Sequence, residues 1–183
     1  MKKILVGLIM LILVTGCGGT LFNPKASPTR AVEDLFTKYQ TLNQEVTNQL
    51  DEVVAEQNLT TAQKDQYKEL MKRQYKDLTY TIKDEVINGD TAIVTVEIQV
   101  YDYARAQIEV DEHVEENPND FLDDNEQFSN LKYMDYKIDT LMKENRKTKY
   151  TLDIRLTKEE DEWLLDELTE TEKQKIHGVY VTA

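Results

Sequence analysis

The clearest candidate for covalent chemistry is the thiol of Cys17, the only cysteine in the chain. Two lysines stand near the start of the sequence, an apolar run covers residues 4–14, and Thr15 and Gly16 directly precede the thiol. A basic start, about 7–15 apolar residues and a small-residue site together indicate a secretory signal peptide. A membrane-spanning helix needs ~20 apolar residues, so this run is too short to cross a bilayer. The sequence therefore predicts an exported protein.

The four residues Val14-Thr15-Gly16-Cys17 resemble the lipobox of bacterial lipoproteins, an aliphatic residue and two small ones before an obligatory cysteine. The resemblance implies that diacylglycerol alkylates the Cys17 thiol and that cleavage between Gly16 and Cys17 removes residues 1–16. Two acyl chains would hold the protein stably on the extracytoplasmic face of the cell membrane. The alternative is a plain secretory signal with a chance cysteine.

Acid–base chemistry would need a carboxylate and a hydroxyl donor that converge in an apolar pocket. The alternation of side chains along two predicted strands puts Asp84 and Asp102 on core-facing positions, with Tyr80 near them. These residues could serve a small-ligand pocket or an isomerase. The alternative is that both carboxylates reach water near strand ends, because buried acids with perturbed pKa values are the exception.

Other kinds of chemistry lack their motifs in this sequence. It contains no glycine-rich phosphate loop, no G-x-S-x-G motif, and no Cys or His pair for metal or nucleophilic chemistry. We therefore expect no enzyme, no cofactor and no metal. The chain has 35 acidic and 22 basic residues, a net charge of −13, which argues against a nucleic-acid partner. The expected partners are the lipid bilayer, through Cys17, and an envelope protein or a small ligand.

Two charged segments suggest contact surfaces. Lys64, Lys68, Lys72 and Lys76 repeat at every fourth position, which on a helix forms a stripe that could contact an anionic polymer or lipid headgroups. The alternative is a solvated flank whose lysine stems cover apolar surface. We expect this stripe to lie nearer the membrane than the acidic segment described next.

The acidic segment covers residues 106–131, which contain no Lys or Arg. Its carboxylates belong to Glu109, Asp111, Glu112, Glu115, Glu116, Asp120, Asp123, Asp124 and Glu126. A calcium loop needs a glycine at its sharp bend, and residues 120–126 have none, so the favoured interpretation is a solvated acidic surface. His113 is expected to be a surface residue with a raised pKa.

The elements that position these residues begin with helices. Ser27-Pro28 is a typical helix start, and apolar residues at three- and four-residue spacing predict one long helix over 28–56. A second helix, capped by Thr61, is predicted to run to about Asp77.

Alternating side chains then predict two strands joined at Asn88-Gly89. A two-residue Asn-Gly loop would place charged residues opposite the apolar ones. We therefore predict a three-residue loop over 87–89 that pairs Val86 with Asp90 and leaves Gly89 left-handed.

A helical insert is predicted between this hairpin and the next. Residues 104–116 favour a helix, although their alternation would equally continue the preceding strand. Residues 126–146 predict another helix, and its inward side chains are expected to be Phe128, Leu131, Met134, Ile138 and Leu141.

A second hairpin follows, with a polar turn over 157–161 and an orientation of Trp163 that the pattern does not fix. Thr169 and Glu172 form a capping box that opens a last helix, and Gly178 follows its end. We expect His177 to carry a charge that suits the helix C-terminus.

This order of elements, with Lys149-Tyr150-Thr151, Glu162-Trp163 and the ending Lys175-Ile176-His177-Gly178-Val179-Tyr180, resembles uncharacterised lipoproteins of Gram-positive bacteria with an NTF2-like or cystatin-like fold. The resemblance implies an α+β fold in which N-terminal helices pack on a curved antiparallel sheet of two hairpins, sometimes around a pocket. We expect a signal peptide over 1–16, a lipidated N-terminus and linker over 17–27, and one domain over 28–183. The expected function is a non-enzymatic binding or interaction domain of the cell envelope, and the alternative is the pocket protein or isomerase.

Overall fold

The computed structural model describes residues 27–181, which form an α+β fold with an open, antiparallel four-stranded sheet in the order β1-β2-β3-β4. The helices are α1 (Pro28–Gln40), α2 (Gln44–Glu56), α3 (Thr61–Lys76), α4 (Tyr103–Glu116), α5 (Asn130–Lys143) and α6 (Glu170–His177), with the 3-10 helix η1 (Pro118–Phe121) between α4 and α5. The strands are β1 (Thr79–Asn88), β2 (Thr91–Tyr101), β3 (Lys147–Glu159) and β4 (Glu162–Leu165).

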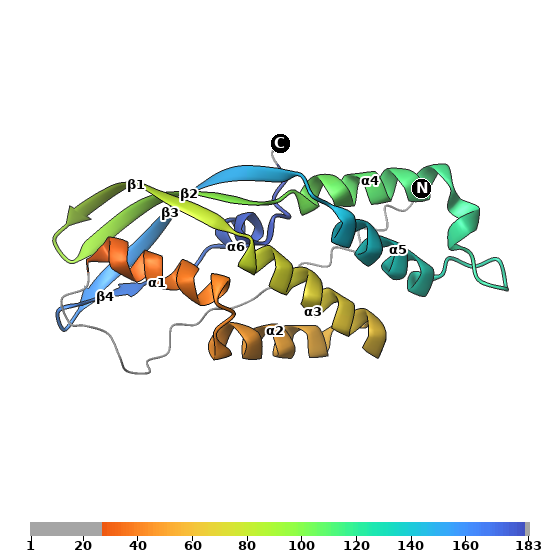
Figure 1. Ribbon diagram of the computed structural model, residues 1–183, viewed down its shortest axis with the longest axis horizontal. Coiled ribbons are helices and arrows are strands. Elements are labelled where there is room, and N and C mark those ends of the chain that lie inside the picture. Colours follow the sequence, from red (N-terminus) through yellow and green to blue (C-terminus); the bar gives the residue numbers. More distant parts are fainter. Residues whose placement is uncertain (1–26, 182–183) are drawn as a thin grey trace.

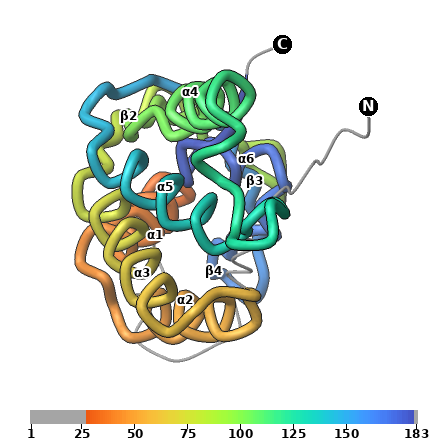
Figure 2. The backbone as a smooth tube through the Cα atoms, turned by 90° about the vertical axis from the view of Figure 1, so that its right-hand side faces the viewer, coloured from red at the N-terminus to blue at the C-terminus, as the bar shows by residue number. Residues whose placement is uncertain are grey.

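The helices α1, α2, α3 and α6 lie on one side of the sheet, and α4, η1 and α5 extend beyond one end of it (Figure 1). We call the segment α4–η1–α5 the arm. Viewed from that end, α5 lies between α4 and α3 (Figure 2), in agreement with the contacts that α5 makes with both helices. The other face of the sheet is open and carries charged pairs such as Lys149 with Glu97 at 3.0 Å. The coarse prediction of helices on an antiparallel sheet of two hairpins is confirmed.

The prediction of one helix over 28–56 is wrong, because the chain breaks between α1 and α2. Leu42 takes a left-handed conformation with φ of 48°, and the side chain of Asn43 accepts a hydrogen bond from the backbone N–H of Val46 as the cap of α2. Both helices bury the apolar face that the spacing predicted. The apolar spacing continues from α1 into α2, so the spacing alone does not indicate the break between them.

The predicted register of the first hairpin is also wrong. Asn88 pairs with Thr91 across a two-residue Gly89-Asp90 loop, and a bulge at Lys83 shifts the register between Ile82 and Asp84. Gly89 is left-handed as predicted, with φ of 61°.

The bulge reverses the orientation of the side chains that follow it in β1, which the apolar pattern of the sequence does not predict. Past Lys83, the core-side positions of β1 pass from even to odd residues, so Glu85 lies opposite the buried Val94. Its carboxylate accepts hydrogen bonds from the backbone N–H (2.8 Å) and the hydroxyl (2.7 Å) of Thr29, in the first turn of α1. A carboxylate stabilises a helix N-terminus, so the bulge ties the hairpin to α1.

The helix predicted over 104–116 is confirmed as α4, and the alternative strand is not formed. The helix predicted over 126–146 begins only at Asn130, where Ser129 caps α5. Its Met134, Ile138 and Leu141 are buried as predicted. Phe128 and Leu131 were predicted to face the core and instead face solvent.

The C-terminal part follows its local signals closely. The Thr169–Glu172 capping box opens α6, and Gly178 ends it in a left-handed conformation with φ of 72°. The turn of the second hairpin is tighter than predicted, because Glu159 pairs with Glu162. Trp163 packs against the core, whereas Leu164 points outward.

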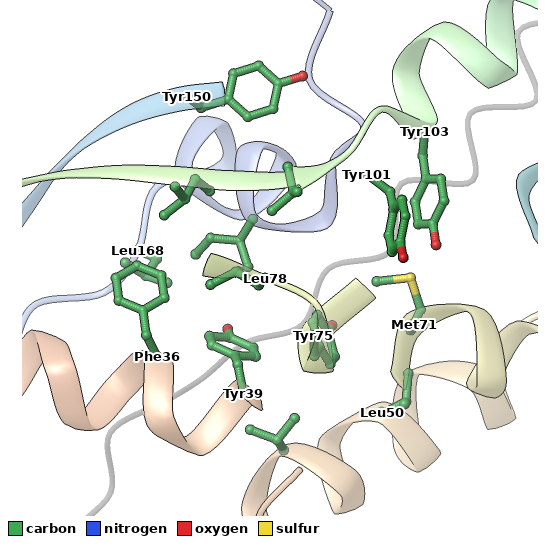
Figure 3. Close-up of a cluster of buried hydrophobic side chains, with 14 of the residues drawn as sticks. Phe36, Tyr39, Leu50, Met71, Tyr75, Leu78, Tyr101, Tyr103, Tyr150 and Leu168 are labelled. Atoms are coloured by element: carbon green, nitrogen blue, oxygen red, sulfur yellow. The ribbon is translucent and has the colours of Figure 1, made fainter. Parts of the chain in front are cut away.

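The core between the sheet and the helices is rich in tyrosine (Figure 3). The rings of Tyr39 and Tyr75 lie 4.9 Å apart, and Tyr75 is also close to His177, at 5.9 Å between ring centroids. The hydroxyl of Tyr75 is buried and has no hydrogen-bond partner among the described residues. Burial raises the pKa of Tyr75 well above its ordinary value, so the ring stays neutral.

Candidate functional site

The structure does not bring Tyr80, Asp84 and Asp102 together. Asp84 is exposed on the open face of the sheet, opposite Thr95, because the bulge reverses its orientation. Asp102 caps α4 by accepting a hydrogen bond from the backbone N–H of Arg105. Seven residues of extended strand separate Thr95 from Asp102, a span of about 23 Å. The two carboxylates therefore cannot act on one small molecule, and Tyr80 instead stacks on Phe36, with the ring centroids 4.9 Å apart.

The lysine stripe lies on α3, but the protein itself uses much of its charge. The ammonium group of Lys68 pairs with Asp51 at 2.8 Å, and that of Lys72 pairs with Glu69 at 2.8 Å. Lys64 donates to the backbone oxygen of Ala55. Lys76 is exposed at the end of the helix. An anionic partner would therefore compete with oxygen atoms of this domain for three of the four lysines.

The prediction that His177 is charged disagrees with its surroundings. The side chain is 4% exposed beside Tyr75, and burial lowers its pKa to about 4, helped by the charge of Lys173. A charge at a helix C-terminus gains roughly 0.3–1 kcal/mol, whereas removing an ion from water costs several kcal/mol. Burial is the larger effect, so His177 is neutral at pH 7.

His113, predicted to be a surface residue, belongs to the arm and is half-buried. Its ring stacks on Tyr136, with ring centroids 4.7 Å apart. The amide of Asn117 lies 3.3 Å from Nδ1 of His113. These contacts give it a packing role between α4 and α5.

The residues that resemble a lipobox, Cys17 among them, lie outside the described residues. Across residues 27–181, no helix is long and apolar enough to cross a membrane. Within the same residues, no group of three or more His, Cys, Asp or Glu side chains is arranged to hold a metal ion.

The arm is joined to the sheet by a dense polar junction. The guanidinium of Arg73 on α3 lies 3.9 Å from the ring centroid of Tyr101 and donates to the backbone oxygens of Met142 and Glu144. The hydroxyl of Tyr101 donates to Asp77 at 2.6 Å. These bonds fix the end of α5 against α3 and the end of β2.

A second contact connects the two helices of the arm. Arg146, just after α5, donates to both carboxylate oxygens of Glu109 on α4, at 2.6 and 2.8 Å. It also pairs with the buried carboxylate of Glu144, and these bonds lower the pKa of both acids. A bidentate arginine–carboxylate pair fixes the relative orientation of the two side chains and also stabilises their contact. The base of the arm is therefore held at both helices.

Lys137 is an unusual titratable group inside the arm. Its side chain is buried, and burial lowers the pKa of its amine despite the charge of Asp111. The hydroxyl of Tyr133 donates to Asp111, and the ammonium of Lys137 lies 5.8 Å from the Tyr133 ring centroid. A lysine of this type can act as a nucleophile where a substrate reaches it. Here only 5% of the residue is exposed, so we assign Lys137 to the packing of the arm.

The loop at the far end of the arm is tightly ordered by its own hydrogen bonds. The carboxylate of Asp123 accepts from the backbone N–H groups of Gln127 and Asn125, and these bonds lower its pKa. The backbone N–H of Ser129 donates to the oxygen of Phe121 at 2.7 Å. Lys132 closes the loop by donating to the oxygen of Leu122 at 2.7 Å.

This ordered loop presents apolar side chains to solvent. Phe128 is 45% exposed, although its ring is 5.9 Å from that of the buried Tyr133, and Leu131, in the first turn of α5, is 52% exposed. Asp120, Asp124 and Glu126, in the residues that lead to Phe128, are exposed as well. We call these five residues the arm-tip surface. Loops that display apolar groups on a rigid support are typical of binding surfaces.

Sequence reasoning missed this surface for an identifiable reason. Phe128 and Leu131 fit the helical spacing of Met134, Ile138 and Leu141, so the periodicity assigned all of them to the core. The contrary signal was local, since Ser129 is a good helix cap and acidic turn residues precede it.

Comparisons of the chain with protein-family models, curated proteins and solved structures found no match.

Proposed function

We propose that the protein is a lipoprotein anchored through diacylglyceryl-Cys17 to the extracytoplasmic face of the cell membrane, and that its domain is a non-enzymatic binding domain. The observation that carries the binding role is the arm-tip surface, where an ordered loop with exposed acidic residues holds Phe128 in solvent. The lipobox Val14-Thr15-Gly16-Cys17 supports the anchor.

The placement of α1 supports this division of roles. Thr29, in the first turn of α1, is bonded to Glu85 near the β1–β2 loop, at the end of the sheet opposite to the arm (Figure 1). Ten residues separate Cys17 from Pro28, and a chain of that length reaches at most ~35 Å. The anchored end of the domain would lie close to the lipid, and the arm would extend into the envelope.

The finer fold assignment is part of the same proposal. Helices on one side of an open antiparallel sheet of two hairpins are compatible with an NTF2-like or cystatin-like domain in which the arm is an insertion. An experimental structure that superimposes on such domains with α1 and the sheet order conserved would support it. A different strand order would refute it.

The anchor is tested with the full chain and a Cys17→Ala variant in cells that are fed a labelled fatty acid. We expect the chain with its own sequence to carry the label and to sediment with membranes, and the Cys17→Ala variant to lose both properties. A Lys25→Ala variant in the same linker is the matched control and should behave like the chain with its own sequence. Equal labelling and equal membrane association of that chain and of Cys17→Ala would refute the lipid anchor.

The binding role is tested in the same cells by photo-crosslinking from single positions. A photoreactive residue at position 128 should give a defined adduct, whereas the same residue at position 86, an exposed apolar site on the sheet, should not. No adduct from position 128, or equal adducts from both positions, would show that the arm tip is not a specific binding surface.

A further inference from the structure

We propose that the partner of the arm-tip surface is a basic amphipathic protein segment, whose apolar residues cover Phe128 and Leu131 while its lysines and arginines face the carboxylates of the loop before Phe128. This inference rests on the proposed binding role and names the class of partner.

The apolar part of the arm-tip surface is preorganised in the absence of a partner. Leu122 forms an isolated bridge with Phe128, and the Phe128 ring lies 5.9 Å from that of Tyr133. Glu126 takes a left-handed conformation with φ of 58°, which is uncommon for a residue other than glycine. The loop thus accepts local strain and keeps an aromatic ring in solvent, and its order reduces the entropy that a partner must remove on binding.

The charge of the arm selects the sign of the partner. Residues 106–131 carry no Lys or Arg, and the exposed acids Asp120, Asp123, Asp124 and Glu126 stand in the loop that leads to Phe128. Lys132, the basic residue that follows, already donates to the Leu122 oxygen. A field of one sign accelerates association with an oppositely charged partner and repels like-charged ones. An anionic bilayer or an acidic protein would therefore be rejected here.

A second exposed apolar group, on the open face of the sheet, lacks these features. Val86 and Ile93 pair across β1 and β2 and are both exposed, but Arg155 is the next neighbour of Ile93 on the same face. No loop of their own positions them, and the sign of the charge around them is mixed. This group therefore offers a matched control rather than a competing site.

The test uses two designed helical peptides of equal length, one built of leucine and lysine and one of leucine and glutamate with the same spacing. A chain from Gly18 onward keeps every residue of the described core and avoids the signal peptide. Binding is followed by fluorescence anisotropy at low and high salt. We expect the lysine peptide to bind with an affinity that falls as salt rises, and the glutamate peptide not to bind.

Substitutions then test whether the peptide binds at the arm-tip surface. Phe128→Ser with Leu131→Ser should weaken binding roughly 30-fold, because two half-exposed apolar side chains lose their contact. Val86→Ser with Ile93→Ser should leave the affinity unchanged. Asp120→Asn with Asp124→Asn should reduce the salt dependence, whereas Glu159→Gln with Glu160→Gln, in the β3–β4 turn, should not. All these positions are exposed, and circular dichroism verifies the fold.

Three results would overturn the proposal. One is equal binding of both peptides, and another is loss of binding from the sheet pair instead of the arm pair. The third is binding of the protein, through Phe128, to phosphatidylcholine–phosphatidylglycerol vesicles in place of the lysine peptide. If crosslinking from position 128 succeeds in cells while the lysine peptide fails to bind, the binding role stands and the partner class is wrong.

Discussion

The neutral, buried imidazole of His177 should make the protein lose stability on mild acidification. Its pKa is about 4 in the fold against about 6.5 in an unfolded chain. Above pH 6.5 the imidazole is neutral in both states and has no effect. As the pH falls below 6.5, the unfolded chain binds a proton that the fold excludes, so the free energy of unfolding decreases. The loss is about 2 kcal/mol at pH 5 and about 3 kcal/mol at pH 4.

The assay is urea unfolding between pH 7.5 and 5, with and without His177→Phe. Both chains carry His113→Gln, so that His177 is the only titrating imidazole, and the carboxylates common to both chains cancel in the difference. As the pH falls to 5, we expect the free energy of unfolding of the His177 chain to decrease by about 2 kcal/mol more than that of the His177→Phe chain.

Two outcomes would refute this reasoning. Parallel stability curves would mean that the folded imidazole titrates at its ordinary pKa. A relative gain of the histidine chain on acidification would mean that the negative end of the α6 dipole outweighs burial. A His177→Gln chain, which is neutral but polar, separates loss of the titration from better apolar packing.

Two further predictions concern stability, measured by thermal and urea unfolding of the chain from Gly18. Tyr75→Phe removes a buried hydroxyl without a partner among the described residues and should stabilise by about 1 kcal/mol, whereas Tyr101→Phe removes the bond to Asp77 and should destabilise by about 1 kcal/mol. A loss of stability in Tyr75→Phe would show that a water or another group satisfies this hydroxyl. Gly178→Ala should destabilise by more than ~3 kcal/mol, because a Cβ there would meet the Tyr101 oxygen at 2.1 Å, whereas Gly89→Ala meets no atom within 4 Å and should cost only about 1 kcal/mol of backbone strain. Equal losses in the two glycine variants would contradict the close approach at Gly178.

Local signals in the sequence were sufficient for much of this fold. Ser27, Thr169 and Gly178 cap helices as their residue types predict, and strand alternation identified both hairpins. These features depend on neighbours within a few residues. Tertiary packing therefore did not change these local structures.

The failures have causes that lie outside the local window. The bulge at Lys83 is explained by the bonds of Glu85 to Thr29, more than fifty residues earlier. His177 is neutral because α3 places Tyr75 against it, which nothing in its neighbourhood along the chain indicates. Asp84 and Asp102 were assigned to one face because an uninterrupted alternation was assumed, and the length of β2 that separates them was not considered.

The arm-tip surface illustrates a different failure, in which the pattern itself was misleading. Apolar residues at helical spacing usually mark the buried face of a helix, yet α5 begins after Phe128 and its buried positions begin at Tyr133. A residue that continues the apolar stripe beyond the supporting surface is only partly covered by its own chain. Phe128 and Leu131 are in that position, and the acids of the preceding loop keep the exposed patch soluble until a partner covers it. Because α1 begins at the other end of the sheet, a partner could cover the patch without displacing the domain from the proposed anchor, so attachment and recognition would be independent properties of the same chain.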